Sequence, residues 1–139
     1  MKHILVAIDG SPGADRALEE AIRLASALKD APAITALHVD PALSMNEPAI
    51  GFDPEARIEA EGLAQLRPAE ALLADSGLNY QTAVRRGDPA REICEFARRE
   101  DCDLIAVGTR GHGPAAELLL GSVSHKVVQH APCPVLTIR

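Results

Sequence analysis

The fold is decided by residues 4–12, which read ILVAIDGSP. The apolar residues Ile4–Ile8 form a continuous run, as expected for a strand of a parallel sheet covered on both faces. In the turn that follows, Ser11 suits a helix N-cap and Pro12 suits the first helical position. Apolar residues then recur at helical spacing for several turns. The stretch therefore predicts a strand, a tight turn and an amphipathic helix.

The same alternation continues along the rest of the chain. Further strands are predicted at 34–39, 80–84, 104–107 and 135–138. Further helices are predicted at 55–76, from residue 89, and at 122–130, with a surface loop at 41–54. Pro68 should kink or split the long helix. This order predicts an α/β fold, a five-stranded parallel sheet with right-handed crossovers and helices on both faces, built as one domain over residues 1–139.

Composition excludes several classes of protein. The net charge of −6 argues against a nucleic-acid surface, and an aromatic content of 2% leaves few platforms for stacking bases. Cys94, Cys102 and Cys133 form no CxxC pair, which indicates free thiols in a reducing compartment. The chain shows no signal-peptide pattern and no apolar run long enough to span a bilayer. We therefore expect a cytoplasmic protein that does not bind nucleic acid and does not insert into a membrane.

The densest functional signal follows the strand at 104–107. Residues 108–113 read GTRGHG and residues 121–124 read GSVS. Ligands of such sheets bind beyond the carboxyl ends of the strands, and glycines allow close approach of the main chain. A helix that begins at Gly121-Ser122 would direct free N–H groups outward, with hydroxyls and the Arg110 guanidinium as further donors. A single glycine more often only makes a turn, but the group as a whole favours an anion-binding site.

Other phosphate and catalytic patterns fit this segment poorly. No Gly-Lys-Ser/Thr follows the glycines, so it is not a P-loop, and the first turn lacks the dinucleotide fingerprint. A phospho-acceptor receiver domain would need an acidic cluster after the first strand, where only Asp9 stands. His112 and His125 fall near the expected phosphates and are candidate general bases, although such histidines are more often solvated.

The glycine-rich segment resembles that of the ATP-binding members of the universal stress protein A family, which carry Gly-x2-Gly-x9-Gly-(Ser/Thr). Gly108, Gly111 and Gly121-Ser122 match this pattern completely. The resemblance covers nearly the whole chain, including the opening ILVAIDGS and the closing APCPVL. It implies a Rossmann-like, adenine nucleotide alpha hydrolase-like fold with strand order 3-2-1-4-5.

The resemblance also implies which residues hold the nucleotide. Those expected around the nucleoside follow three strands: Ala7, Ile8, Asp9, Val39, Val107 and Gly108. Those expected around the phosphates are Gly111, Gly121, Ser122, Val123 and Ser124. From the glycine-rich segment itself we add Thr109, Arg110, His112 and Gly113 to the predicted binding residues. The implied ligand is ATP, ADP or AMP, with Mg²⁺ bound mainly through phosphate oxygens. Residues 115–117, AAE, stand where many relatives have a basic residue, so ATP and AMP both stay open.

Members of the family usually dimerise through the last strand. Here that strand, Val135–Ile138, is aliphatic, carries few charges and is expected at a sheet edge, which favours a homodimer. The resemblance implies a nucleotide-dependent stress-response or regulatory module with a regulated protein partner. A slow ATP hydrolase and a nucleotide-independent adaptor remain as alternatives.

Overall fold

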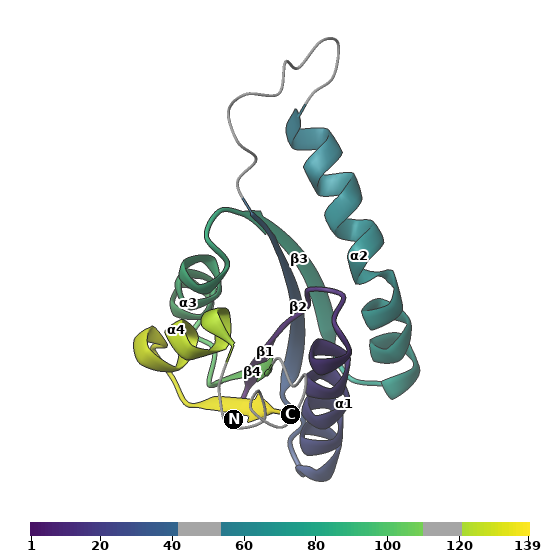
Figure 1. The fold of residues 1–139 in the computed structure, drawn as a ribbon. Helices are drawn as coiled ribbons and strands as arrows, with labels where there is room; N and C mark the ends of the chain where they lie inside the picture. The colour runs from purple at the N-terminus through teal and green to yellow at the C-terminus, as the bar shows by residue number, and fades with distance from the viewer. Residues whose placement is uncertain (42–53, 110–120) are drawn as a thin grey trace.

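The computed structural model describes residues 1–41, 54–109 and 121–139, in which five strands form one parallel sheet (Figure 1). The strands are β1 (His3–Ala7), β2 (Ala33–Asp40), β3 (Tyr80–Arg86), β4 (Leu104–Gly108) and β5 (Val135–Ile138). The helices are α1 (Pro12–Ala27), α2 (Pro54–Ser76), α3 (Pro89–Arg99) and α4 (Ser122–His130). The strand order β3-β2-β1-β4-β5 confirms the predicted fold class and order. The loop predicted at 41–54 lies almost entirely outside the described residues.

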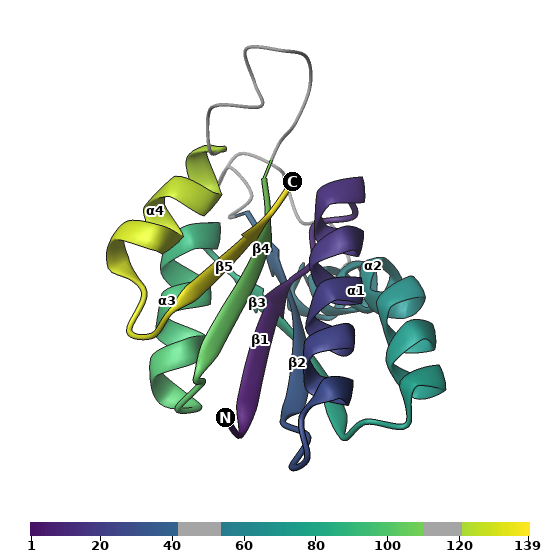
Figure 2. The ribbon, with the colours of Figure 1, turned by 90° about the horizontal axis from the view of Figure 1, so that it is seen from below.

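The helices cover the two faces of the sheet in pairs (Figure 2). Successive residues of a strand point to opposite faces, so β1 contributes Ile4 and Val6 to one face and Leu5 to the other. The first face packs against α1 and α2, and the second against α3 and α4. Because both faces are covered, β1 is buried along its middle, which explains its uninterrupted apolar sequence.

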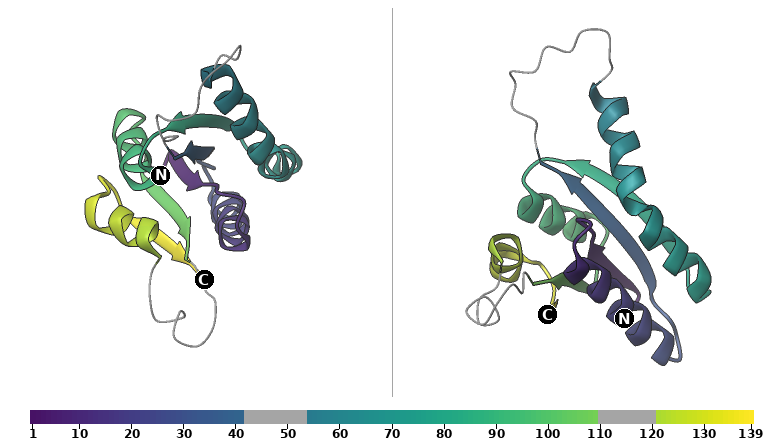
Figure 3. Two further views of the ribbon diagram at one scale, coloured as in Figure 1. Left: turned by 45° about the horizontal axis from the view of Figure 1, so that its top comes forward. Right: turned by 45° about the vertical axis from the view of Figure 1, so that its right-hand side comes forward.

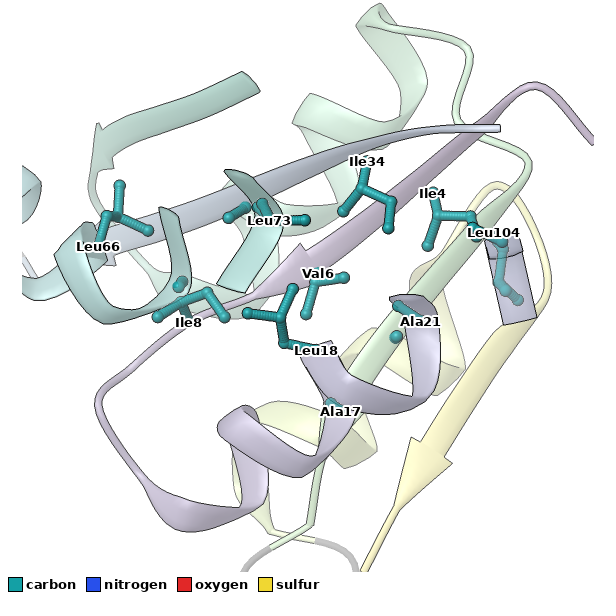
Figure 4. Packing of buried hydrophobic residues seen from close by; sticks show 14 residues of the cluster. Ile4, Val6, Ile8, Ala17, Leu18, Ala21, Ile34, Leu66, Leu73 and Leu104 are labelled. Atoms are coloured by element: carbon teal, nitrogen blue, oxygen red, sulfur yellow. The ribbon is translucent and has the colours of Figure 1, made fainter. Parts of the chain in front are cut away.

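The core between the sheet and helices α1 and α2 is entirely aliphatic (Figure 4). Leu18 of α1 and Leu66 and Leu73 of α2 lie against Val6 and Ile34 of the sheet, and all five are 0–1% exposed. Removing a leucine from such a site costs about 2–5 kcal/mol. This packing holds α1 rigidly over β1 and β4, so the first turn of α1 lies at the carboxyl ends of these strands.

Helix α2 continues through Pro68 without splitting, contrary to one of the two outcomes expected from sequence. A proline removes the hydrogen bond to the carbonyl four residues earlier, here that of Ala64. Both Pro68 and Ala64 are exposed, so water can satisfy this carbonyl. On its other side, α2 lies along β2 and β3, as the right-hand view of Figure 3 shows.

The chain reverses its direction of winding at the centre of the sheet. From β1 it runs outward through β2 to β3, then returns to place β4 on the other side of β1. The crevice beyond the carboxyl ends of β1 and β4 is the point at which open α/β sheets bind ligands. Close packing at this point depends on glycine: a Cβ on Gly108 would overlap the main chain of Gly13 in α1. Gly108 therefore lets α1 approach β4.

Candidate functional site

A cavity of about 420 Å³ opens at the carboxyl ends of β1, β2 and β4, between the first turns of α1 and α4. Its volume lies within the range of about 300–1,000 Å³ typical of small-molecule sites. Ten of the residues singled out from sequence line it: Ala7, Ile8, Asp9, Val39, Val107, Gly108, Thr109, Gly121, Val123 and Ser124. The structure thus brings together segments more than one hundred residues apart along the chain.

The remaining predicted residues are placed differently. Ser122 is the first residue of α4 and is exposed, and it is not among the residues that line the cavity. Arg110, Gly111, His112 and Gly113 lie outside the described residues. His125, considered above as a general base, is exposed on α4 and does not line the cavity either.

Sequence reasoning missed several lining residues. These come from the start of α1, the end of β2 and the start of α3: Ser11, Pro12, Gly13, Ala14, Arg16, Leu37, His38, Pro41, Pro89 and Ile93. The signal for α1 was present, because Pro12, Gly13 and Arg16 are spaced so that they share one side of a helix. The contribution of α3 depends on how that helix crosses the sheet, which no local pattern indicates.

The helix N-termini at this end of the sheet differ in how their free N–H groups are satisfied. In α1 the Ser11 hydroxyl accepts a hydrogen bond from the Ala14 N–H at 3.2 Å. In α3 the Asp88 carboxylate accepts from the Arg91 N–H at 3.0 Å. Each of these helices also carries an acidic residue in its first turn. Helix α4, with Gly121 at its N-cap, has no acidic residue in its first turn and no side-chain cap from any residue in the described ranges, an arrangement that suits an anion.

At this helix end, one of the two hydroxyls predicted as further donors is already engaged within the chain. The Ser124 hydroxyl donates to the Gly121 carbonyl at 3.0 Å, and Ser124 is only 3% exposed. The N–H groups of Ser122, Val123 and Ser124 belong to the first turn, whose N–H groups have no partner within the helix. Val123 and Ser124 also line the cavity, where N–H groups of this kind can donate to an anion.

The opposite part of the cavity presents an acceptor. Asp9 is exposed beyond β1, and one of its carboxylate oxygens accepts a hydrogen bond from the Ser11 N–H at 2.9 Å. Its second oxygen has no hydrogen-bond partner among residues 1–41, 54–109 and 121–139, and can accept from a hydroxyl or amino group of a ligand. The His38 Nδ1 lies 2.9 Å from the Ile8 carbonyl oxygen, which fixes the His38 ring beside Asp9.

The three cysteines lie away from this cavity and have no nucleophilic character. All three belong to or contact the core on the α3 and α4 side of the sheet. Burial raises the pKa of the Cys102 thiol to about 12 and also raises the pKa of Cys94 and of Cys133. They are therefore protonated at neutral pH and act as packing residues.

A doubly wound parallel sheet with a cavity at the carboxyl ends of its strands defines a Rossmann-like α/β protein. Comparison with known proteins identifies the group: the model of the universal stress protein family matches residues 1–139, and the chain belongs to this family. It is 36% identical over 146 residues to the universal stress protein YxiE of Bacillus subtilis, covering 98% of this chain and 97% of that protein.

Solved structures agree with this assignment. The universal stress protein UspA from Lactobacillus plantarum superposes with a TM-score of 0.78 at 30% identity, covering 99% of this chain and 97% of that one. A universal stress protein family member from Arabidopsis thaliana, solved with AMP bound, gives a TM-score of 0.71 at 28% identity, with 99% and 91% covered. The resemblance recognised in the sequence is therefore confirmed.

Proposed function

We propose that this chain binds an adenine nucleotide in the carboxyl-end cavity and acts as a nucleotide-dependent module of a cytoplasmic stress response. The observation that carries the proposal is the uncapped N-terminus of α4, which lines a cavity of nucleotide size. The AMP bound to the Arabidopsis thaliana relative supports the choice of ligand.

The lining residues suit the parts of a nucleotide. The apolar side chains of Ala7, Val39 and Val107 offer a surface for the adenine ring, and the free Asp9 oxygen is an acceptor for ribose hydroxyls. The N–H groups at the start of α4 would hold phosphate oxygens. The chain therefore has groups for the base, the sugar and the phosphates within one cavity.

ATP with Mg²⁺ fits this cavity better as a bound ligand than as a substrate. No cluster of three or more metal-ligating side chains occurs among residues 1–41, 54–109 and 121–139, so Mg²⁺ would be bound mainly by phosphate oxygens. Within the same ranges, the cavity's titratable side chains are Asp9, Arg16 and His38, and His38 already contacts the Ile8 carbonyl. We therefore favour nucleotide binding over hydrolysis.

The edge strand β5 supports a homodimer. Within the described part of the chain, β5 pairs only with β4, so the main-chain groups along its other side are available to a second copy. None of the described helices has the length and hydrophobicity to span a bilayer. Sedimentation equilibrium gives the mass directly: we expect twice 14.7 kDa, and a monomer at micromolar concentration would contradict the dimer.

The test of nucleotide binding is calorimetric titration of the purified protein with ATP, ADP and AMP. The Gly121→Val variant places a branched side chain over the N–H groups of α4 and should weaken binding more than about tenfold, or about 1.4 kcal/mol. The control is Gln129→Val, which adds the same side chain to the exposed last turn of α4. Equal nucleotide affinity of Gly121→Val and the wild type would refute the site.

A further inference from the structure

Arg16 forms part of the cavity wall opposite the start of α4. It follows Pro12 by one helical turn, and both residues line the cavity from α1. Arg16 itself is exposed, so its guanidinium is not needed to complete the hydrophobic core. Figure 2 shows the first turn of α1 on one side of the end of β5 and the first turn of α4 on the other.

The charge of the cavity gives this residue a specific importance. Among the described residues that line it, Arg16 is the one arginine and no lysine occurs. The protein carries a net charge of −6, and Asp9 adds a negative charge to the cavity itself. The helix end supplies only about half of a positive charge. Mg²⁺ held by phosphate oxygens can balance part of the negative charge of a phosphate chain, and among the described residues that line the cavity Arg16 is the cationic side chain that can balance more of it.

The Arg16 guanidinium makes a hydrogen bond within the described part of the chain through its Nε alone. Its Nε donates a hydrogen bond to the main-chain oxygen of Arg139 at 2.6 Å. Its two terminal nitrogens make no hydrogen bond to any residue in the described ranges. A planar guanidinium can donate along two directions at once, and this geometry suits phosphate oxygens. Arg16 can therefore hold Arg139 and a phosphate at the same time.

A second lining residue also holds the end of β5. The Thr109 N–H donates to the Ile138 carbonyl at 2.7 Å, and the Thr109 hydroxyl lies 3.2 Å from the same oxygen. The main-chain oxygens of Ile138 and Arg139 thus accept hydrogen bonds from two residues that line the cavity. Two residues of the cavity wall are therefore hydrogen-bonded to the end of β5.

We propose that Arg16 is a phosphate-binding residue of the cavity that couples phosphate occupancy to the end of β5 through its bond to Arg139. This inference depends on the nucleotide binding proposed above. A bound phosphate fixes the Arg16 side chain, and a fixed Arg16 holds Arg139 more firmly. By thermodynamic reciprocity, an ordered β5 strengthens phosphate binding to the same extent.

The coupling would make the edge strand respond to the presence of a phosphate on the ligand. Adenosine lacks the group that Arg16 would bind, so it should leave the end of β5 unchanged. ATP and ADP should slow amide exchange in this strand. Arg16 thus distinguishes a phosphorylated ligand from its nucleoside, in a family member whose residues 115–117 lack a basic side chain.

The test compares adenosine, AMP, ADP and ATP by calorimetry in the wild type, Arg16→Gln and Arg16→Lys. Arg16→Gln should lower ATP affinity about tenfold or more, as for loss of a charge-assisted hydrogen bond, while changing adenosine affinity less than about twofold. Arg16→Lys keeps the charge without the fork and should recover part of the ATP affinity. The matched control is Arg23→Gln on the exposed side of the same helix, which should bind all four ligands as the wild type does.

Hydrogen exchange provides the second measurement. ATP should slow exchange of the amides of residues 135–139 in the wild type but not in Arg16→Gln. If the wild type binds none of the four ligands, the proposed function fails and this inference fails with it. If the wild type binds ATP and Arg16→Gln binds it equally well, or loses ATP and adenosine to the same extent, only the role of Arg16 is refuted. If Arg16→Gln does not fold, Arg16→Lys replaces it in this measurement. The bridging geometry would be refuted if ATP slowed amide exchange of residues 135–139 in Arg16→Lys as strongly as it does in the wild type.

Discussion

The two ends of the parallel sheet use their polar groups in opposite ways. At the amino ends, the Asp103 carboxylate accepts from the Lys2 and His3 N–H groups at 2.6 and 2.9 Å. The buried Thr35 hydroxyl lies 2.6 Å from His3 Nε2 and 2.9 Å from Gln81 Nε2. Every buried side-chain polar atom in the described part of the chain has a hydrogen-bond partner. These polar groups at the amino ends therefore hydrogen-bond to one another and stabilise the fold.

At the carboxyl ends, several polar groups are left over. The first N–H groups of α4, one oxygen of Asp9 and the terminal nitrogens of Arg16 surround the cavity without a partner in the described ranges. All of them are accessible from the cavity, so water can satisfy them and a ligand can replace that water. The polar groups at the amino ends stabilise the fold, whereas those at the carboxyl ends are the ones that we propose bind a ligand. Substitutions at the two ends should therefore have separable effects on stability and on binding.

The largest expected effect comes from making the start of α4 resemble the start of α3. In Gly121→Asp, the new side chain can cap the N–H groups as Asp88 does, which should stabilise the protein by a few tenths to about 1 kcal/mol. The same carboxylate occupies the anion position, so ATP affinity should fall about 100-fold or more. Chemical denaturation and calorimetry measure the two effects. Gly121→Asn, a cap without charge, should lose less affinity, and unchanged ATP binding in Gly121→Asp would overturn the assignment.

The next effect belongs to the amino end. Thr35→Val removes the hydroxyl and leaves the nitrogens of His3 and Gln81 without their shared partner, so the free energy of unfolding should fall by about 1–3 kcal/mol. ATP affinity should not change, because the hydroxyl lies at the far end of the sheet. Thr35→Ser keeps the hydroxyl and should retain most of the stability. A Thr35→Val protein as stable as the wild type would show that the network is not stabilising.

The smallest effect is the pH dependence due to Asp103. Hydrogen bonds from the Lys2 N–H, and then from the His3 N–H, lower the pKa of the Asp103 carboxyl below its ordinary value of 3.8. A lowered pKa in the folded state means that the stabilisation is present above the unfolded pKa and is lost as the pH falls through the folded pKa. Asp103→Asn should therefore show a shallower loss of thermal stability on acidification. Identical melting temperatures of variant and wild type from neutral to acid pH would contradict this role.

Local sequence signals determined the strands and helices. The apolar run Ile4–Ile8 and the cap-and-proline pairs at Ser11 and Asp88 act through neighbours within one turn, so they can be recognised without knowing the fold. The glycine spacing was sufficient to identify the family, which the comparisons bear out. The effect of Pro68 was less predictable, because it depends on which face of α2 is exposed.

The composition of the cavity wall was decided by tertiary structure. Arg16 and Ile93 enter the wall because helices pack on the sheet at particular positions, and packing couples residues far apart in sequence. The sequence indicates a ligand-binding role for Gly108. In the fold, the lack of a side chain at Gly108 also allows the main chain of Gly13 to pack against it.

The sequence by itself therefore determined the α/β order, the family and the position at which α4 begins, because these depend on short-range hydrogen bonding and hydrophobic periodicity. Tertiary structure alone decided that Arg16 meets Arg139 at the cavity and that His3 meets Thr35 at the other end. Such contacts require strands and helices from distant segments to be brought together by burial of the core, and no local pattern specifies where those surfaces touch.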